Sequence, residues 1–307
     1  METWKSIAIN YFNDDYSKYK SSFGDGRRPD SVKFSTIEED VKRRDFTINA
    51  LFYDSVKEEI VDLVGGIDDL KNGIIRCVGD PIDRFYQDRL RMLRALRFSA
   101  VLDFTIEDNT FDALIGMFDL SAVSRERIAE ECRKVCSNGK EAVIRFLGNY
   151  IFKQKFPFSG EVFSTAQIPF FGWQNVITED ISTLLAVVYC NSKNTNNKNF
   201  FVGRKFTDNE ARRTLFLISI RQFKPDYMYV LKKEFEFCKE YKGLKDSDVL
   251  NFFEFHGKSR EHAQKFIDFK ITLRGDDFKG KIPDKEIGMT ILRKTEEQFL
   301  KFLKGEV

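Results

Sequence analysis

The spacing of apolar residues after position 83 constrains the fold of this chain most strongly. In 83–101, 124–137 and 141–150, apolar side chains recur at intervals of three and four residues, which is typical of amphipathic helices. This character predicts that the remainder of the chain is predominantly helical. Because the chain has 307 residues and a domain has about 150, we expect roughly two domains, or several small helical ones.

The residues before position 83 carry strand and turn signals instead. β-Branched and aromatic residues predict short strands at 6–12, 31–34, 50–53 and 60–63, the last closed by Gly65-Gly66. A polar stretch at 191–199 predicts an exposed loop between helices. The sequence therefore predicts an α+β fold, in which a small α+β unit precedes a mainly α-helical remainder.

Composition narrows the class of protein. No apolar run approaches the roughly 18 to 20 residues of a membrane span, and the N-terminus lacks signal-peptide features, so we expect a cytoplasmic protein without a membrane partner. Five scattered cysteines predict reduced, buried thiols, and with His256 and His262 as the two histidines no zinc site is expected. The 32 phenylalanines are interpreted as core residues. With a net charge of +2, a polyanion would be held by local basic clusters.

The first cluster of residues suited to ligand binding is the segment 43–50, Arg-Arg-Asp-Phe-Thr-Ile-Asn-Ala. Arginine pairs offer bidentate donors to phosphate oxygens, and a nearby carboxylate can accept hydrogen bonds from ribose hydroxyls. A nucleotide would satisfy both groups. Taken alone, an Arg-Arg-Asp triplet is also common on protein surfaces without any binding function.

The second cluster is the segment 84–98. If it forms one helix, Gln87, Asp88, Arg91 and Arg94 lie on one broad polar face, opposite an apolar face with Leu93. Asp88 would accept from an exocyclic amine and Arg91 would donate to a ring nitrogen or carbonyl, the pattern that a base edge requires. The alternative is an exposed helix with salt bridges along its surface.

The order of these and neighbouring segments along the chain is similar to that in a known protein family. The segments, in chain order, are 26–32, 38–40, 43–50, 62–66 and 88–98. In this order the chain resembles the class II tRNA nucleotidyltransferases, or CCA-adding enzymes, and the bacterial poly(A) polymerases. The likeness extends to 124–131 and, more faintly, to 275–276 and 283–288.

The resemblance implies binding of CTP and ATP, with Mg²⁺ as the family's metal and tRNA as the partner. In that family Arg-Arg-Asp recognises the phosphate and ribose of the nucleotide, and a Glu-Asp-x-x-Arg helix serves as the protein template for the base. The nucleotide-binding residues implied here are Arg43, Arg44, Asp45, Asn49, Asp88, Arg91, Arg94 and Arg97. Gln87 stands where the template usually has Glu, which keeps a hydrogen-bonding group but removes a charge.

The implied domains are a remnant of the nucleotidyltransferase head at 1–82, a helical neck with the template helix at 83–139, a helical body at 140–230 and a helical tail at 231–307.

The family's head begins with a Gly-Gly-x-Val-Arg-Asp turn and an Asp-x-Asp pair that binds two magnesium ions. No such segment precedes Gly26, and Ala8 stands at the position of the family's third carboxylate. Because two-metal phosphoryl transfer needs anionic ligands, we expect no catalytic or metal-binding residues in this chain and no activity of the chain alone.

Three explanations for the missing carboxylates stay open. A separate chain supplies the missing strands and carboxylates, for example by adding to the edge of the strand at 6–12. The chain is instead a non-catalytic RNA-binding relative. The third explanation is a misassigned start or a decaying gene. Within the family, poly(A) addition is the alternative to CCA addition.

Overall fold

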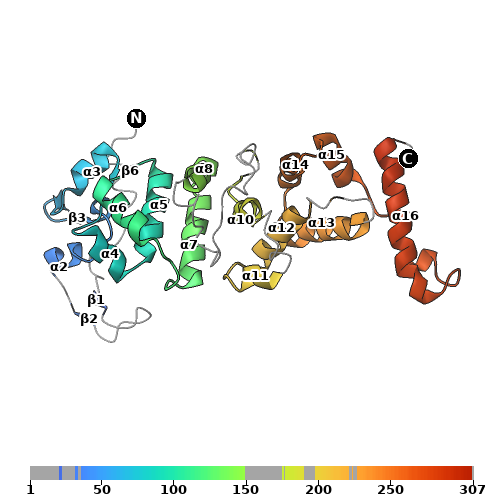
Figure 1. Cartoon of the computed structure of the whole chain (residues 1–307), viewed down its shortest axis with the longest axis horizontal. Helices are drawn as coiled ribbons and strands as arrows, with labels where there is room; N and C mark the ends of the chain where they lie inside the picture. Colours follow the sequence, from blue (N-terminus) through green and yellow to red (C-terminus); the bar gives the residue numbers. More distant parts are fainter. Residues whose placement is uncertain are drawn as a thin grey trace. The chain divides into compact units, whose positions relative to one another are not determined.

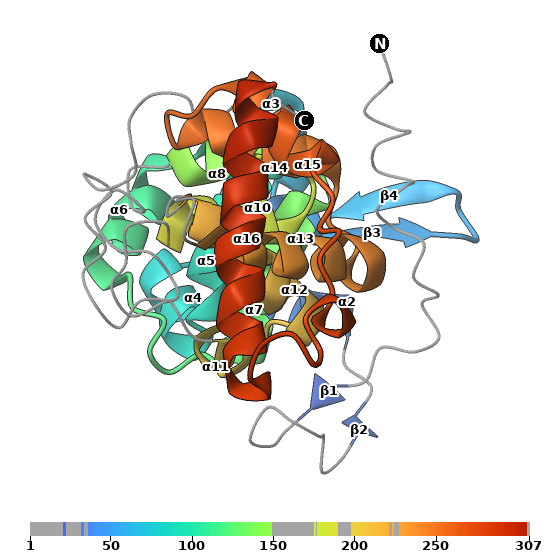
Figure 2. The same cartoon turned by 90° about the vertical axis from the view of Figure 1, so that its right-hand side faces the viewer.

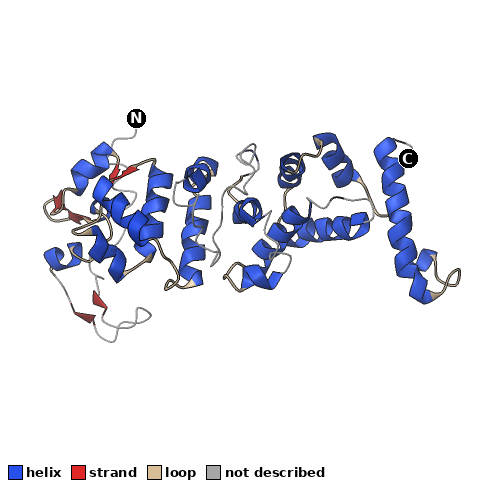
Figure 3. Ribbon diagram, in the orientation of Figure 1, coloured by secondary structure: helices blue, strands red, loops and turns tan. Residues whose placement is uncertain are grey.

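The structure is a computed structural model, and it describes residues 21–22, 32–33, 36–148, 175, 177–189, 198–220, 223 and 227–305. The chain divides into two compact units, Met1–Glu131 and Cys132–Val307. Figure 1 colours the elements along the chain, and Figure 3 shows that helices predominate while the strands belong to the N-terminal part. The α+β fold is thus confirmed, whereas the four-part domain division stays a prediction.

The described residues of the N-terminal unit form three pairs of short strands. β1 (Ser21–Ser22) pairs with β2 (Val32–Lys33), and β3 (Leu51–Asp54) with β4 (Glu59–Asp62), both antiparallel. β5 (Ile74–Ile75) pairs in parallel with β6 (Thr105–Ile106). The predicted strands at 50–53 and 60–63 are therefore confirmed to within a residue, and the one at 31–34 is confirmed for its two central residues. The predicted strand at 6–12 lies outside the described residues.

Figure 2 shows the β3–β4 hairpin, whose turn is held by a side chain. The Asp54 carboxylate accepts hydrogen bonds from the backbone N–H groups of Val56 and Lys57, at 2.9 and 3.1 Å. These two bonds lower the pKa of Asp54, because they stabilise its charged form. Such local bonding by Asp favours a tight turn.

The predicted turn at Gly65-Gly66 joins the hairpin to α3 (Gly66–Asn72). Gly65 has a φ of +78°, which glycine adopts without strain. At Gly66 a Cβ atom would lie 2.2 Å from the backbone oxygen of Thr47, in the 3₁₀ turn η2 (Thr47–Asn49). The second glycine therefore permits the close approach of α3 to the segment that carries the first predicted cluster.

The helices of the N-terminal unit include two before position 83 that were not predicted, and the helix predicted at 83–101 is interrupted. They are α2 (Ile37–Val41), α3, α4 (Pro81–Gln87), α5 (Leu90–Leu102), α6 (Asp108–Met117) and the first half of α7 (Arg125–Cys136). The expectation of one continuous helix through Gln87, Asp88 and Arg91 is wrong. Asp88 is extended, with φ −150° and ψ 104°, and its Oδ1 accepts the Leu90 N–H at 3.0 Å. Its side chain thus begins a new helix, as a capping carboxylate does.

The C-terminal unit is helical wherever it is described as regular structure. Its elements are the second half of α7, α8 (Lys140–Gly148), α10 (Ile181–Tyr189), α11 (Lys198–Val202), α12 (Asp208–Ser219), α13 (Met228–Lys242), α14 (Asp246–Phe255), α15 (Arg260–Asp268), η7 (Gly275–Asp277) and α16 (Asp284–Lys304). The helical segments predicted at 124–137 and 141–150 are confirmed within the described residues. Of the loop predicted at 191–199, residues 198 and 199 begin α11, and 191–197 lie outside the described residues.

Phenylalanines form the core of this unit, as the composition predicted. Phe266 packs on Phe235 and Phe253, with ring centroids 5.4 and 5.5 Å apart, and all three are at most 2% exposed. The four cysteines in the described residues are buried. Within the described chain, none of the helices combines the length and apolar character needed to cross a membrane.

Candidate functional site

The Arg-Arg-Asp segment leaves the end of α2 and enters η2. The Arg44 guanidinium donates from Nε to Asp40 Oδ2 at 3.1 Å and from Nη1 to the Asn49 backbone oxygen at 2.7 Å. It also lies over the Phe52 ring, 4.7 Å from the centroid. These contacts fix one of the two predicted phosphate-binding guanidiniums, while the neighbouring Arg43 side chain is exposed.

Asp45 joins the two predicted clusters. Its side chain is almost buried, and its Oδ1 accepts from the Phe46 N–H at 2.9 Å and from Asn49 Nδ2 at 3.2 Å. Its Oδ2 accepts from Arg94 of α5, at 2.7 Å from Nε and 2.6 Å from Nη2. Residues 49 positions apart in sequence are thus linked by a charge-assisted contact, which is stronger than a neutral hydrogen bond.

Arg91 supplies a second link between the clusters. Its Nη2 donates to the Arg43 backbone oxygen at 2.6 Å, and its Nη1 lies 3.2 Å from the Arg84 backbone oxygen and 3.3 Å from Gln87 Oε1. Burial and the positive charge of Arg84 lower the pKa of Arg91. The break at Asp88 therefore does not separate Gln87 from Arg91, and both remain beside the Arg-Arg-Asp segment.

Asp88 lies at the joint between α4 and α5 and faces α7. Its two oxygens accept from Arg127, with Nη1 to Oδ1 at 3.2 Å and Nη2 to Oδ2 at 2.6 Å. The sequence included Arg127 in the resemblance at 124–131 but assigned it no function. Acidic and basic groups 39 residues apart are hard to pair from sequence alone.

Arg97 is placed differently from the other predicted residues. It is 7% exposed, and its Nε lies 2.6 Å from Glu131 Oε2, with the guanidinium stacked on Phe98. Glu131 is itself buried and also lies 3.7 Å from Arg94 Nη1. A chain of charges therefore runs from Asp45 through Arg94 and Glu131 to Arg97, and Arg97 anchors it instead of facing solvent.

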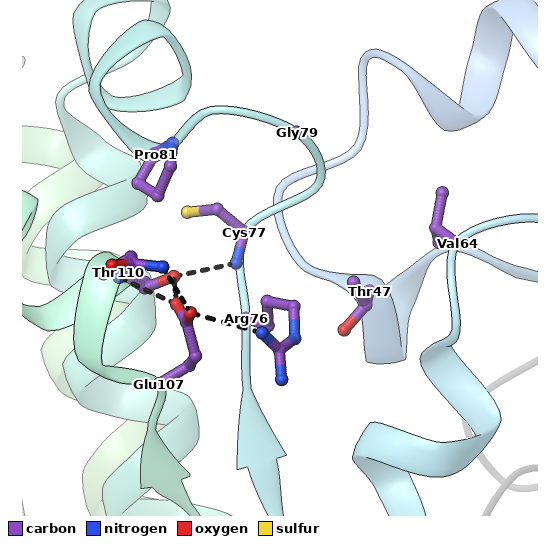
Figure 4. A pocket seen from close by; sticks show the side chains of 9 residues that line it. Thr47, Val64, Arg76, Cys77, Gly79, Pro81, Glu107 and Thr110 are labelled. Atoms are coloured by element: carbon purple, nitrogen blue, oxygen red, sulfur yellow. Dashed lines mark hydrogen bonds and ion pairs between the residues drawn. The ribbon is translucent and has the colours of Figure 1, made fainter.

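Figure 4 shows a cavity of about 350 Å³ in the same unit. Its lining residues are Thr47, Val64, Arg76, Cys77, Gly79, Pro81, Glu107, Asn109 and Thr110. The polar groups of the cavity bond to one another: Arg76 Nη1 lies 3.2 Å from Glu107 Oε1, and the Cys77 N–H donates to Thr110 Oγ1 at 3.2 Å. Burial raises the pKa of the Cys77 thiol to about 12, so this cysteine is not an activated nucleophile. None of the predicted site residues lines the cavity.

The carboxylates of this region do not suit a magnesium ion. Asp40, Asp45 and Asp88 each bind an arginine, and Mg²⁺ takes carboxylate oxygens in a near-octahedral set. Among the described residues, no group of three or more His, Cys, Asp or Glu side chains is placed to hold a metal. The arrangement instead offers donors for phosphate and paired donor and acceptor groups for a base and a ribose.

Sequence comparison finds similarity to a head-domain family and to CCA-adding enzymes. A family model described as the poly A polymerase head domain matches residues 11–76. A CCA-adding enzyme of Ligilactobacillus salivarius is 47% identical over 138 residues, which make up 44% of this chain and 34% of that enzyme. The chain is therefore matched to about a third of the length of this relative.

Solved structures share the fold over a longer stretch. The Bacillus stearothermophilus CCA-adding enzyme in complex with CTP has a TM-score of 0.52 and 20% identity, over 90% of this chain and 72% of that one. The Thermotoga maritima CCA-adding enzyme complexed with tRNA has a TM-score of 0.52 and 17% identity, over 88% of this chain and 73% of that one. In sequence over part of its length, and in fold over most of it, the chain resembles the class II tRNA nucleotidyltransferases and poly(A) polymerases, as its motifs predicted.

Proposed function

We propose that the N-terminal unit binds CTP and ATP and that the chain acts in the addition of C and A to tRNA 3′ ends. The observation that supports this most is the contact between Asp45 and Arg94, at 2.6 to 2.7 Å. It holds the Arg-Arg-Asp segment against α5, so the groups for the phosphate, the ribose and the base lie in one region. This is the combination that a nucleotide requires.

In this proposal the guanidiniums of Arg43 and Arg44 bind the triphosphate, and Asp45 and Asn49 bind the ribose. Asp88 accepts from the exocyclic amine of cytosine or adenine, and Arg91 donates to the ring. Arg94 and Arg97 act through the buried carboxylates that they hold, Asp45 and Glu131. A cytoplasmic location remains a prediction.

We further propose that tRNA is bound through its phosphates by basic side chains of the helical remainder. α16, for example, carries Lys285, Arg293, Lys294, Lys301 and Lys304 along its 21 residues. Affinity for tRNA should then fall steeply with salt, since phosphate contacts release counterions. Filter binding at two salt concentrations tests this, and an affinity independent of salt would contradict it.

The carboxylates that hold magnesium are proposed to come from a separate chain. Ala8 at the third carboxylate position and the arginine-bound acids of the described site support this. The test is calorimetric titration with CTP and ATP, followed by incorporation of labelled nucleotides into tRNA that lacks its terminus. We expect binding but no incorporation by the chain alone, and incorporation once a protein with Gly-Gly-x-Val-Arg-Asp and Asp-x-Asp segments is added. Transfer by this polypeptide alone, abolished by changing one of its own acids, would refute the separate source.

Two other functions are distinguished by the same experiment. Poly(A) addition, the activity named in the description of the matched head-domain model, would give long A tracts from ATP without a need for CTP. Binding of tRNA and nucleotide with no incorporation, even with the added protein, would instead indicate a non-catalytic RNA-binding relative.

A further inference from the structure

The proposed base-reading carboxylate is already occupied by a side chain of the protein. Arg127, near the start of α7, approaches both oxygens of Asp88, with its Nη2 2.6 Å from Oδ2. Asp88 Oδ1 also accepts the Leu90 N–H at 3.0 Å. An exocyclic amine of a base would have to compete with Arg127 for the same oxygens.

This ion pair is the more exposed of the two pairs that bridge the site. The Arg127 and Asp88 side chains are 50% and 30% exposed, whereas those of Arg94 and Asp45 are 28% and 9% exposed. Exposed ion pairs contribute little, because water solvates both charges once they separate. Arg127 can therefore leave Asp88 at low cost, while Arg94 stays on Asp45.

We propose that Arg127 lowers base selectivity by competing with the nucleotide for Asp88, an inference that rests on the proposed nucleotide site. When Arg127 departs, the Leu90 N–H still orients Asp88, so the carboxylate becomes a free acceptor without losing its position. A free carboxylate attracts the exocyclic amines of cytosine and adenine and repels the carbonyl oxygens of uracil and guanine. Arg127 is thus a positioning residue that weakens this discrimination while it is bound.

The test compares R127M with R89M, by calorimetric titration of the full chain with CTP, ATP, UTP and GTP. Arg89 is a matched control, because it also loses one exposed ion pair, to Asp119 at 3.0 Å, without touching Asp88. R127M should bind CTP and ATP about two- to five-fold more tightly than R89M does, the range expected for removing an exposed ion pair. Its affinity for UTP and GTP should not increase.

R127K provides the graded variant. Lysine keeps the charge but cannot form the bidentate contact, so its affinity for CTP should lie between those of the original chain and R127M. Thermal unfolding of each variant shows whether the fold is kept, which the exposure of Arg127 favours.

The possible failures are distinguishable. If R127M binds CTP no better than R89M, or gains equally for CTP and UTP, the selectivity role of Arg127 is overturned while the nucleotide site stands. If the original chain and all variants fail to bind any nucleotide, the proposed site is refuted, and the role of Arg127 with it.

Discussion

Both compact units contain ion pairs between distant segments, such as Arg213 with Asp180 in the C-terminal unit, but most of the described aromatic contacts belong to the C-terminal unit. In the N-terminal unit, arginines and carboxylates from distant segments pair across the candidate site, as Arg94 does with Asp45. In the C-terminal unit, buried aromatic rings pack on one another, as Phe266 does on Phe235. Ion pairs require particular partners in particular places, whereas an aromatic core needs apolar volume. The comparison indicates that the candidate site depends on a few specific pairs, while the described core of the C-terminal unit depends on apolar packing.

Loss of a core ring in the C-terminal unit should have the largest effect. Phe266→Ala removes a fully buried side chain that contacts three other phenylalanines, Phe223, Phe235 and Phe253, so we expect a loss of about 3 to 5 kcal/mol in the free energy of unfolding. Urea unfolding followed by circular dichroism measures it. Nucleotide binding by the N-terminal unit should persist below the new transition, and its loss together with the C-terminal unit would show that the two regions are not separable.

A steric clash introduced at Gly66 in the N-terminal unit should have the next largest effect on stability. Gly66→Ala places a Cβ 2.2 Å from the Thr47 backbone oxygen, so α3 must shift, at a cost of about 3 kcal/mol. Gly116→Ala in α6 is the control, since nothing lies within 4 Å of the added Cβ and alanine favours a helix. Thermal unfolding of the two variants should give shifts of opposite sign, and equal shifts would contradict the close approach.

Neutralising Asp45 should lower the free energy of unfolding less than the two changes above, but it should weaken nucleotide binding. Asp45→Asn keeps the shape but removes the charge that accepts two donor atoms of Arg94, so we expect a loss of about 2 kcal/mol. CTP affinity, measured by calorimetry, should fall at least ten-fold, because the ribose acceptor and the placement of α5 are both weakened. Unchanged CTP affinity in a folded variant would remove Asp45 from the site.

The smallest effect concerns a charge inside the aromatic core. Lys232 is 2% exposed, and its Nζ donates to the backbone oxygens of Phe266 and Ile267 at 2.8 and 2.7 Å. Burial lowers its pKa from 10.5 to about 8. Between these values the unfolded chain binds more protons than the folded chain, so the free energy of unfolding rises with pH in this window.

The Lys232→Met variant isolates this dependence. Relative to the variant, the original chain should gain about 1 to 2 kcal/mol between about pH 8 and about pH 10. Urea unfolding at the two pH values measures the difference, and Lys233→Met on the exposed face of α13 is the control. Parallel pH profiles for the original chain and the Lys232 variant would show that this lysine keeps its proton throughout.

Local patterns made much of the fold predictable from the sequence. β-Branched and aromatic residues predicted the strands β3 and β4, though not their pairing, and three- and four-residue spacing predicted α7 and α8. The break at Asp88 could not be read from periodicity, because it depends on a side chain that caps the following helix.

The residues of the candidate site were easier to identify than their partners. Arg94 and Asp45 were both predicted, and the structure brings them together. The pairing of Arg97 with Glu131 and of Asp88 with Arg127 arises from α7, at sequence separations of 34 and 39 residues. Such contacts depend on tertiary packing, and no spacing rule along one helix foretells them.

The burial of Lys232 makes it a chemical reporter of motion. An amine that is deprotonated near pH 8 reacts with acylating reagents more readily than an ordinary lysine, yet its seclusion denies reagents access. Labelling at Lys232 would therefore proceed only through transient openings of α13 and α15. The labelling rate, measured by mass spectrometry, would report how often these helices open.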